Sequence, residues 1–286
     1  MNRIIAVHDI SGYGRCSLGV VLPVLAAMGT RACPLPTAYL SAHTAFPASD
    51  KAVFWDLTDA LEPSLAHWDE LKGQFNGFYS GFLGSVRQIG LLRNYLAAQT
   101  RPDFLIFIDP VMGDHGAPYR TYTPEMCGEM ASLAALADVI TPNLTEAALL
   151  LGEEYDPCPS WEKAQDWLAR LSLDGRRSVV LTGLSSAQNR LGAGCWSRGT
   201  ARASLFEAPL APGHFAGSGD LFASILLGRL LSGGSLEDGT ETAVSFVSRA
   251  AHYTLAQGDD PTEGISFEPL LPLLSRQIGL SDSLGL

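Results

Sequence analysis

The chain of 286 residues has few basic residues for its length. It contains 19 lysines and arginines against 30 aspartates and glutamates, which gives a formal net charge of −11. Nucleic-acid surfaces need clustered Lys and Arg for phosphate contacts, and anionic membranes attract basic segments. The charge balance therefore argues against both partners. It does not exclude a nucleotide, because a cation and a few backbone amides can hold phosphates locally.

Cysteine is also scarce, and long apolar runs are missing. The five cysteines are scattered, and no two of them form a CxxC pair. This pattern is neither a disulfide framework nor a zinc site, and it fits a reducing compartment. No apolar run approaches the roughly 20 residues that span a bilayer. Residues 1–9 lack the apolar region of a signal peptide. We therefore expect a cytoplasmic protein without a membrane partner.

Segments typical of strands alternate with segments typical of helices along most of the chain. Such alternation predicts an α/β protein with a mainly parallel central sheet flanked by helices. The content of 47% hydrophobic and 17% charged residues is sufficient for a large core. The expected strands are 3–10, 31–39, 77–83, 104–111, 139–143 and 178–182, with a hairpin over 192–207. The expected helices are 18–28, 85–98, 124–137, 145–151, 161–171, 217–231 and 236–256.

Residues 40–46 and 51–58 are rich in β-forming side chains, and we expect no helix after them. They predict a small β-lid around 38–58 that stands apart from the main sheet. No linker, internal repeat or low-complexity tract divides the chain. We therefore expect one domain over 1–286 with this lid as an appendage.

Polar motifs follow four of the expected strands. They lie after Ile10, at Asp109, at 141–143 and at Thr182. Parallel sheets bind ligands beyond the carboxyl ends of their strands. We therefore expect these four points to surround one site.

Residues 217–220, Gly-Ser-Gly-Asp, open an expected helix. The glycines let the backbone turn tightly, and amides at a helix start form an anion site that the helix dipole favours. A carboxylate there, Asp220, can take a proton from a hydroxyl that attacks a phosphoryl group. The structural alternative is that Asp220 complements its helix while the glycines make a turn.

Two further pairs are candidate ligands of a cation or of phosphates. Asp109 and Asp114 lie five residues apart on a turn after an apolar strand, where both carboxylates can face a metal held between phosphates. Asn143 and Glu146 lie three residues apart where a helix begins, so both can point towards one site. The structural alternatives are an ordinary turn for the first pair and, for the second, a helix capped by Thr145.

Together these segments resemble the ribokinase-like kinases, and among them the pyridoxal kinases. Residues 217–220 look like the G-A/T-G-D anion-hole motif, with serine at its variable position. Residues 109–114, Asp-Pro-Val-Met-Gly-Asp, resemble D-P-V-M/L-G-D, and residues 141–146 match T-P-N-x-x-E. The resemblance covers essentially the whole chain in the expected order. It implies the ribokinase-like three-layer α/β fold with a small β-lid.

The same resemblance assigns roles to these residues. Asp220 would be the catalytic base, and the anion hole would comprise Gly217, Ser218 and Gly219. The residues near ATP and its phosphates would be Asp109, Asn143 and Thr182. The residues that serve Mg²⁺ would be Asp109, Asp114 and Glu146, with Glu146 acting through metal-bound water. Taken alone, Thr182 is only a threonine at the end of a strand.

The family motifs in the N-terminal part of the chain concern the substrate. Residues 11–14, Ser-Gly-Tyr-Gly, resemble the opening of pyridoxal kinases, in which the serine meets the pyridine ring. His43 and Thr44 resemble the H-T pair of the lid region. Phe82 stands where the family has the tyrosine of T-G-Y, which keeps an aromatic wall but removes a hydroxyl. The implied substrate-binding residues are Ser11, Tyr13, His43, Thr44 and Phe82.

The implied activity is ATP- and Mg²⁺-dependent phosphorylation of the 5′-hydroxymethyl group of pyridoxal, pyridoxine or pyridoxamine, as in vitamin B6 salvage. The resemblance also implies a homodimer with a contact through the lid. The sequence leaves open which vitamer is preferred and whether a monovalent cation such as K⁺ is required.

Other functions have less support. Hydroxymethylpyrimidine kinase, or an enzyme of dual specificity, is the nearest alternative, although its S-D-x-S-G-G-A-G loop is missing here. A catalytically silent ligand-binding protein on the same fold is the non-enzyme alternative, and the presence of Asp220 argues against it. A dinucleotide fingerprint fails because Ser17 replaces its third glycine. No G-x-x-x-x-G-K-S/T phosphate loop is present.

Overall fold

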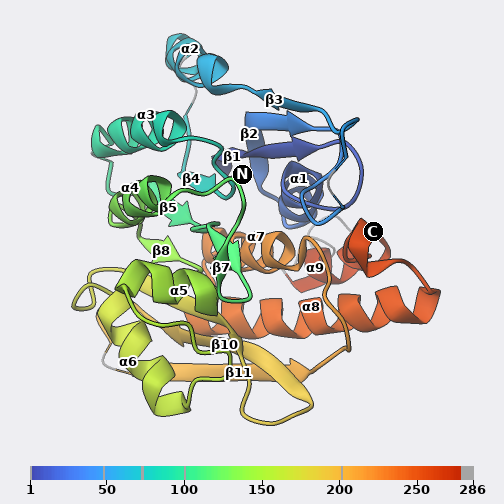
Figure 1. Cartoon of the computed structure of the whole chain (residues 1–286). Coiled ribbons are helices and arrows are strands. Elements are labelled where there is room, and N and C mark those ends of the chain that lie inside the picture. Colours follow the sequence, from blue (N-terminus) through green and yellow to red (C-terminus); the bar gives the residue numbers. More distant parts are fainter. Residues whose placement is uncertain (1, 48, 72–73, 100, 201, 278–286) are drawn as a thin grey trace.

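The computed structural model of the protein describes residues 2–47, 49–71, 74–99, 101–200 and 202–277. Within these ranges nine strands form one sheet in the order β11-β10-β9-β8-β5-β4-β1-β2-β3 (Figure 1). The strands are β1 (Arg3–Ser11), β2 (Arg31–Leu40), β3 (Phe54–Asp56), β4 (Gly77–Ser80), β5 (Leu105–Ile108), β8 (Val139–Ile140), β9 (Ser178–Leu184), β10 (Arg190–Trp196) and β11 (Ala203–Pro209). A separate two-stranded ribbon consists of β6 (Gly113–Asp114) and β7 (Ala117–Pro118).

The inner strands β2, β1, β4, β5, β8 and β9 run parallel, and antiparallel strands close both edges of the sheet. Ile4, Ile5, Ala6 and Val7 of β1 are all fully buried. A parallel strand that is covered on both faces needs such a continuous apolar run. The predicted parallel sheet and the predicted hairpin of β10 and β11 are confirmed.

Helices cover both faces of the sheet (Figure 1). One layer, packed on one apolar core, consists of α1 (Leu18–Ala27), α7 (Ser218–Leu231), α8 (Leu236–Gln257) and α9 (Leu271–Gln277). The other layer, packed on a second core, consists of α2 (Thr58–Glu70), α3 (Val86–Ala97), α4 (Pro124–Ala134), α5 (Leu144–Leu151) and α6 (Trp161–Leu171). Two short 3₁₀ helices, Pro261–Glu263 and Glu268–Leu270, precede α9. The expected three-layer architecture is confirmed.

The middle of helix α7 is buried on every side. The eight residues from Leu221 to Gly228 are all buried, so this helix belongs to the core and does not present a polar face to water. Its N-terminus is consequently held in a fixed place. None of the helices in the described part of the chain is long and apolar enough to cross a membrane.

The prediction for residues 40–46 and 51–58 is wrong in two respects. Strand β3 pairs antiparallel with β2, so it forms the edge of the main sheet and does not stand apart from it. Helix α2 follows directly, and Leu61 and Leu65 are buried in the core beneath it. Pro63 lies inside α2, and an internal proline normally ends a helical pattern. Residue 48, within the expected lid, lies outside the described residues.

Candidate active site

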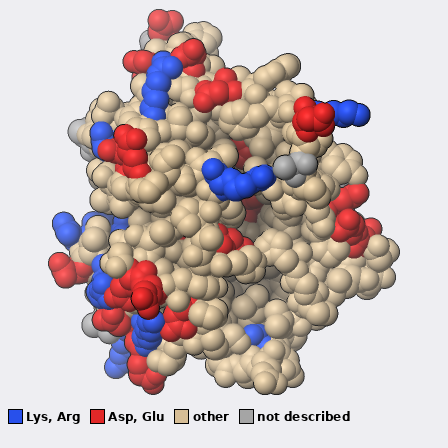
Figure 2. Space-filling model, in the orientation of Figure 1, with Lys and Arg blue, Asp and Glu red and all other residues tan. Residues whose placement is uncertain are grey.

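A cavity of about 880 Å³ opens at the carboxyl ends of the parallel strands. Figure 2 shows acidic side chains in the hollowed middle of this face. The four strand ends with polar motifs all contribute to its lining, as the sequence predicts. The predicted residues that line it are Ser11, His43, Thr44, Phe82, Asp109, Asp114, Asn143, Glu146, Thr182, Gly217, Ser218, Gly219 and Asp220.

Tyr13 is the predicted residue that the structure does not place in this lining. Its side chain is 54% exposed, and its hydroxyl donates a hydrogen bond of 2.6 Å to Glu263 Oε1. That hydrogen bond raises the pKa of Tyr13. The Tyr13 ring lies 5.5 Å from the ring of Phe46, so the residue joins two surface loops.

Asp220 lies in the first turn of α7, directly after a tight turn at Gly217. Gly217 has φ 73°, and a Cβ atom there would lie 2.1 Å from the carbonyl oxygen of Arg15. Only glycine meets both conditions without displacing the backbone. The amide of Ser218 donates to the carbonyl of Phe215 at 3.3 Å, so one of the three predicted anion-hole amides already has an internal partner.

The carboxylate of Asp220 is held by the segment between β1 and α1. Its Oδ2 accepts hydrogen bonds from the amide of Ser17 (2.9 Å) and from the thiol of Cys16 (3.4 Å). The pKa of Asp220 is raised to about 6, mainly by burial and to a smaller extent by the charge of Asp9, while the two hydrogen bonds oppose the rise. A carboxylate with a pKa close to neutral is suited to accept and release a proton.

Two further carboxylates, those of Asp109 and Glu146, are buried and line the same cavity. Burial, followed by the charge of Asp220, raises the pKa of Asp109 to about 8, and a 3.1 Å hydrogen bond from the hydroxyl of Thr141 opposes this shift. Burial, followed by the charge of Asp109, raises the pKa of Glu146 well above its usual range. Carboxylates crowded in this way disfavour one another's charged form, and a bound cation would relieve the repulsion.

Asn143 and Glu146 form a capping box at the start of α5. Asn143 Oδ1 accepts from the amide of Glu146 (2.9 Å), and Glu146 Oε2 accepts from the amide of Asn143 (2.8 Å). The same two side chains reach the 109–114 segment through Gly113 O and the amide of Met112. The cap of α5 is therefore Asn143, and the interpretation of Thr145 as the cap is wrong. The hydroxyl of Thr145 instead accepts a hydrogen bond from the amide of Gly116 (2.9 Å).

Sequence reasoning missed Asp9, which orients Ser11 at the end of β1 and Ser17 just before α1. Asp9 Oδ2 accepts from the hydroxyl of Ser11 (2.9 Å), and Oδ1 accepts from the hydroxyl of Ser17 (2.5 Å). Ser17 has φ 50°, which is unusual for a residue other than glycine. Asp9 and Ser11 are two residues apart on a strand, and this spacing, which places them on one face, was the available signal.

His8 was also missed. Its side chain is fully buried, and burial lowers its pKa to about 3, so the imidazole is neutral near pH 7. Its Nδ1 lies 3.9 Å from Asp220 Oδ1, and its ring meets the edge of Tyr79 with centroids 4.3 Å apart. A single histidine inside an apolar strand carries no motif, and only the fold places it behind Asp220.

The substrate-side residues lie near the β2–β3 connection and after β4. His43 is buried beside Phe46, with ring centroids 4.6 Å apart, and burial lowers its pKa. Thr44 is exposed at the cavity. Phe82 is half-buried, and its ring lies 6.2 Å from that of Tyr122. An aromatic wall and a hydroxyl group therefore face the same cavity as Asp220.

Comparisons with known proteins agree over nearly the whole chain. The phosphomethylpyrimidine kinase family model matches residues 73–263. A structure from Bacteroides thetaiotaomicron, described as a phosphomethylpyrimidine kinase and solved in a form with pyridoxal, is 39% identical, with a TM-score of 0.90 over 96% of this chain and 95% of that chain. Pyridoxal kinase from Lactobacillus plantarum is 30% identical, with a TM-score of 0.88 over 99% of both chains. The pyridoxine/pyridoxal/pyridoxamine kinase of Bordetella avium is 29% identical over 88% of this chain and 85% of its own length.

Proposed function

The chain belongs to the phosphomethylpyrimidine kinase family and has the ribokinase-like fold of the pyridoxal kinases, and we propose that it phosphorylates the 5′-hydroxymethyl group of pyridoxal, pyridoxine or pyridoxamine with ATP. One observation carries the proposal: a largely buried carboxylate, that of Asp220 with 13% of its side chain exposed, stands at the N-terminus of α7 in the cavity that four strand ends line.

Asp220 is the general base of this reaction. It takes the proton of the acceptor hydroxyl as the hydroxyl oxygen forms a bond to the γ-phosphorus and the bond from that phosphorus to the β-phosphate oxygen breaks. The N-terminus of α7, with Gly217 and Gly219, faces the transferring group, because helix dipoles and free amides favour negative charge there. His8, neutral and fully buried behind Asp220, adds no charge that would hold the aspartate permanently ionised.

The donor set fits Mg²⁺. Asp109, Asp114 and Glu146 offer hard carboxylate oxygens, and a cation beside Asp109 and Glu146 would favour their charged forms, which burial and neighbouring carboxylates disfavour. We assign Mg²⁺ to these three residues, with Glu146 reaching it through bound water because its two oxygens already accept amide hydrogen bonds. When bound, Mg²⁺ neutralises charge on the nucleotide phosphates. Asn143 and Thr182, which line the same cavity, would contact those phosphates.

On the acceptor side, Ser11 meets the pyridine ring, with its hydroxyl oriented by Asp9. His43, Thr44 and Phe82 complete the pocket, and Phe82 supplies an apolar wall without a hydroxyl. Pyridoxal in the Bacteroides thetaiotaomicron structure supports a pyridine acceptor. The family of phosphomethylpyrimidine kinases, which has relatives that also act as hydroxymethylpyrimidine kinases, favours one alternative acceptor class, a pyrimidine that carries a hydroxymethyl or phosphomethyl group.

An acceptor comparison distinguishes the two rings. ATP consumption with Mg²⁺ is measured on pyridoxal, pyridoxine, pyridoxamine, hydroxymethylpyrimidine and ribose at matched concentrations. We expect turnover on the pyridines and little on ribose. Turnover on the pyrimidine alone would move the enzyme to a different substrate and leave the mechanism in place. No turnover on any acceptor, with ATP still bound, would favour the non-catalytic alternative.

A homodimer and a cytoplasmic location complete the proposal. Edge strand β3 exposes Phe54 (49%) and Trp55 (64%), a pair of large apolar side chains suited to a partner. All five cysteines are unpaired, which fits a reducing compartment. The β2–β3 region would then act as the lid over the acceptor while it contacts the second subunit.

A further inference from the structure

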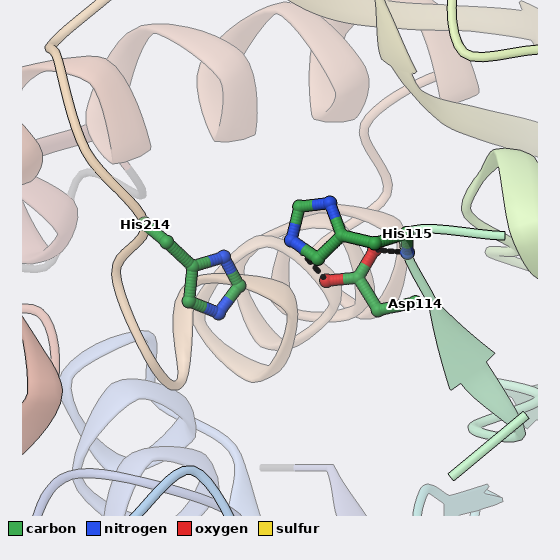
Figure 3. A group of neighbouring side chains, drawn as sticks. All are labelled: Asp114, His115 and His214. Atoms are coloured by element: carbon green, nitrogen blue, oxygen red, sulfur yellow. Dashed lines mark hydrogen bonds and ion pairs between the residues drawn. The ribbon is translucent and has the colours of Figure 1, made fainter. Parts of the chain in front are cut away.

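Three potential metal ligands in the cavity lining lie close to one another (Figure 3). They are Asp114, His115 and His214, and their ligand atoms all lie within 4.8 Å of one another. Asp114 and His115 belong to the β6–β7 ribbon, and His214 lies in the loop before α7. All three line the cavity, and neither histidine has a role in the phosphoryl transfer described above. We propose that these three residues bind a borderline divalent cation such as Zn²⁺.

The Asp114–His115 half of the site already has the required spacing. His115 Nε2 lies 3.5 Å from Asp114 Oδ2, and two ligands of a tetrahedral zinc ion are about 3.4 Å apart. The other carboxylate oxygen, Oδ1, accepts a 2.8 Å hydrogen bond from the amide of His115. This bond orients the carboxylate and leaves Oδ2 for the ion, as hydrogen bonds behind metal ligands commonly do.

His214 can complete the set by a side-chain rotation. Its ring centroid lies 5.4 Å from that of His115 on the facing loop (Figure 3). The side chain of His115 is 76% exposed, and His214 is exposed as well, so neither ring is held by packing. From a separation of at most 4.8 Å, an approach of about 1.4 Å or less reaches tetrahedral spacing.

The turn itself shows that an imidazole at position 115 is not the conformationally favoured choice. His115 and Gly116 connect β6 to β7 with φ values of 52° and 81°. A two-residue hairpin turn with both φ values positive favours Asn-Gly. His115 keeps the left-handed conformation while it presents a nitrogen ligand beside Asp114.

The donor set selects the class of cation. Two imidazole nitrogens and one carboxylate suit Zn²⁺, Ni²⁺ or Co²⁺, whereas Mg²⁺ prefers oxygen ligands. Three protein ligands also leave at least one position open towards the cavity. A bound ion would draw the β6–β7 ribbon and the loop before α7 together. It would also occupy Asp114, one of the residues assigned to Mg²⁺.

Binding is tested by isothermal titration of ZnCl₂ into the untagged, metal-free protein, without nucleotide or acceptor. We expect one equivalent of tight binding that excess MgCl₂ does not displace. His115→Asn, which suits the turn, and His214→Asn should each weaken binding by about tenfold or more. His67→Asn, an exposed histidine on α2, is the matched control and should bind as the wild type does.

The contrary outcomes are distinct. Unchanged affinity in His214→Asn, or no binding to the wild type, would overturn the site. Displacement by Mg²⁺ would show an oxygen-ligand site and overturn the choice of cation.

A second arm, which rests on the proposed kinase activity, measures inhibition of ATP consumption by Zn²⁺ at fixed MgATP. The inhibition by Zn²⁺ should be at least partly relieved in the His214→Asn variant. Because the titration needs no turnover, its failure and the failure of the proposed function are distinguishable.

Discussion

At the scale of single residues, the ionisation of Asp220 should govern the acid side of the pH profile. A general base must be deprotonated, and burial raises the pKa of Asp220 from 3.8 to about 6. We expect kcat/KM to fall below about pH 6, by ~10-fold per pH unit once Asp220 is mostly protonated. The pH profile is measured with pyridoxal and with pyridoxine. If a group of the enzyme sets the acid limb, the limb has the same midpoint with both substrates.

Asp9→Asn is the matched variant for this profile. The charge of Asp9 raises the pKa of Asp220, and the amide side chain of asparagine can still accept from one serine. The acid limb should therefore move to lower pH. A limb that stays in place, or moves to higher pH, would show that another group controls it.

Asp109 should cost stability at neutral pH when no cation is present. Its folded-state pKa of about 8 lies above the ordinary 3.8, so its contribution to stability is fully present below about pH 4 and is lost as pH rises through 8. Asp109→Asn removes the buried charge. We expect the variant to gain roughly 1–3 kcal/mol in unfolding free energy over the wild type at pH 8 and much less at pH 5.

Urea denaturation in EDTA at the two pH values measures this difference. Asp59→Asn, whose carboxylate is 89% exposed, is the control and should show no pH-dependent gain. An Asp109→Asn variant that is less stable than the wild type at pH 8 would contradict the account.

At the scale of elements, the turn into α7 depends on one glycine more than on the other. Gly217→Ala combines φ 73° with a contact of 2.1 Å to a backbone carbonyl, whereas a Cβ on Gly219 meets nothing within 4 Å. We expect Gly217→Ala to lose about 2 kcal/mol or more and nearly all activity, because the carbonyl of Arg15 must move. Gly219→Ala should fold with wild-type stability or better, since alanine favours a helix.

Thermal unfolding of both variants measures this contrast. Equal melting temperatures for Gly217→Ala and the wild type would contradict the assigned turn. Gly219→Ala also tests the phosphate site separately from folding. If this variant is stable and less active, the loss comes from the added methyl group beside the phosphate site.

Much of the element order follows from the sequence, and the exceptions have physical reasons. β1 and β5 were predictable because buried parallel strands are continuous apolar runs bounded by turn residues. α2 was not, because Pro63 interrupts its pattern, and β3, with only three residues, joins the sheet through pairing that no local signal encodes. The 3₁₀ turns and α9 after residue 258 were not predicted either.

Some residues of the candidate site could likewise be predicted from the sequence, and others could not. Asp220 and the other strand-end residues could be found because their spacing forms motifs. His8 and Asp9 could not be assigned, because a buried polar group becomes informative only when its neighbours are known. His115 and His214 are about a hundred residues apart in the chain, and only the packing of the β6–β7 ribbon against the loop before α7 brings them together.

At the scale of the whole molecule, the exposed apolar edge of β3 should hold the proposed homodimer together. Trp55 is 64% exposed, and a charge there would be buried without a partner in a dimer interface. We expect Trp55→Glu to weaken the dimer by about tenfold or more in sedimentation equilibrium. Leu71→Glu alters a side chain of similar exposure (65%) elsewhere on the surface and should leave association unchanged. A wild type that is monomeric at all concentrations would refute the interface.

The central claim is phosphoryl transfer with Asp220 as the base, and one comparison tests it directly. Formation of phosphorylated pyridoxal from pyridoxal and MgATP is followed for the wild type and for Asp220→Asn, with ATP affinity measured in parallel. The account predicts a fall in turnover of about 10²–10⁴-fold, with ATP still bound, because asparagine keeps the shape and cannot take the proton. Turnover close to that of the wild type would contradict it.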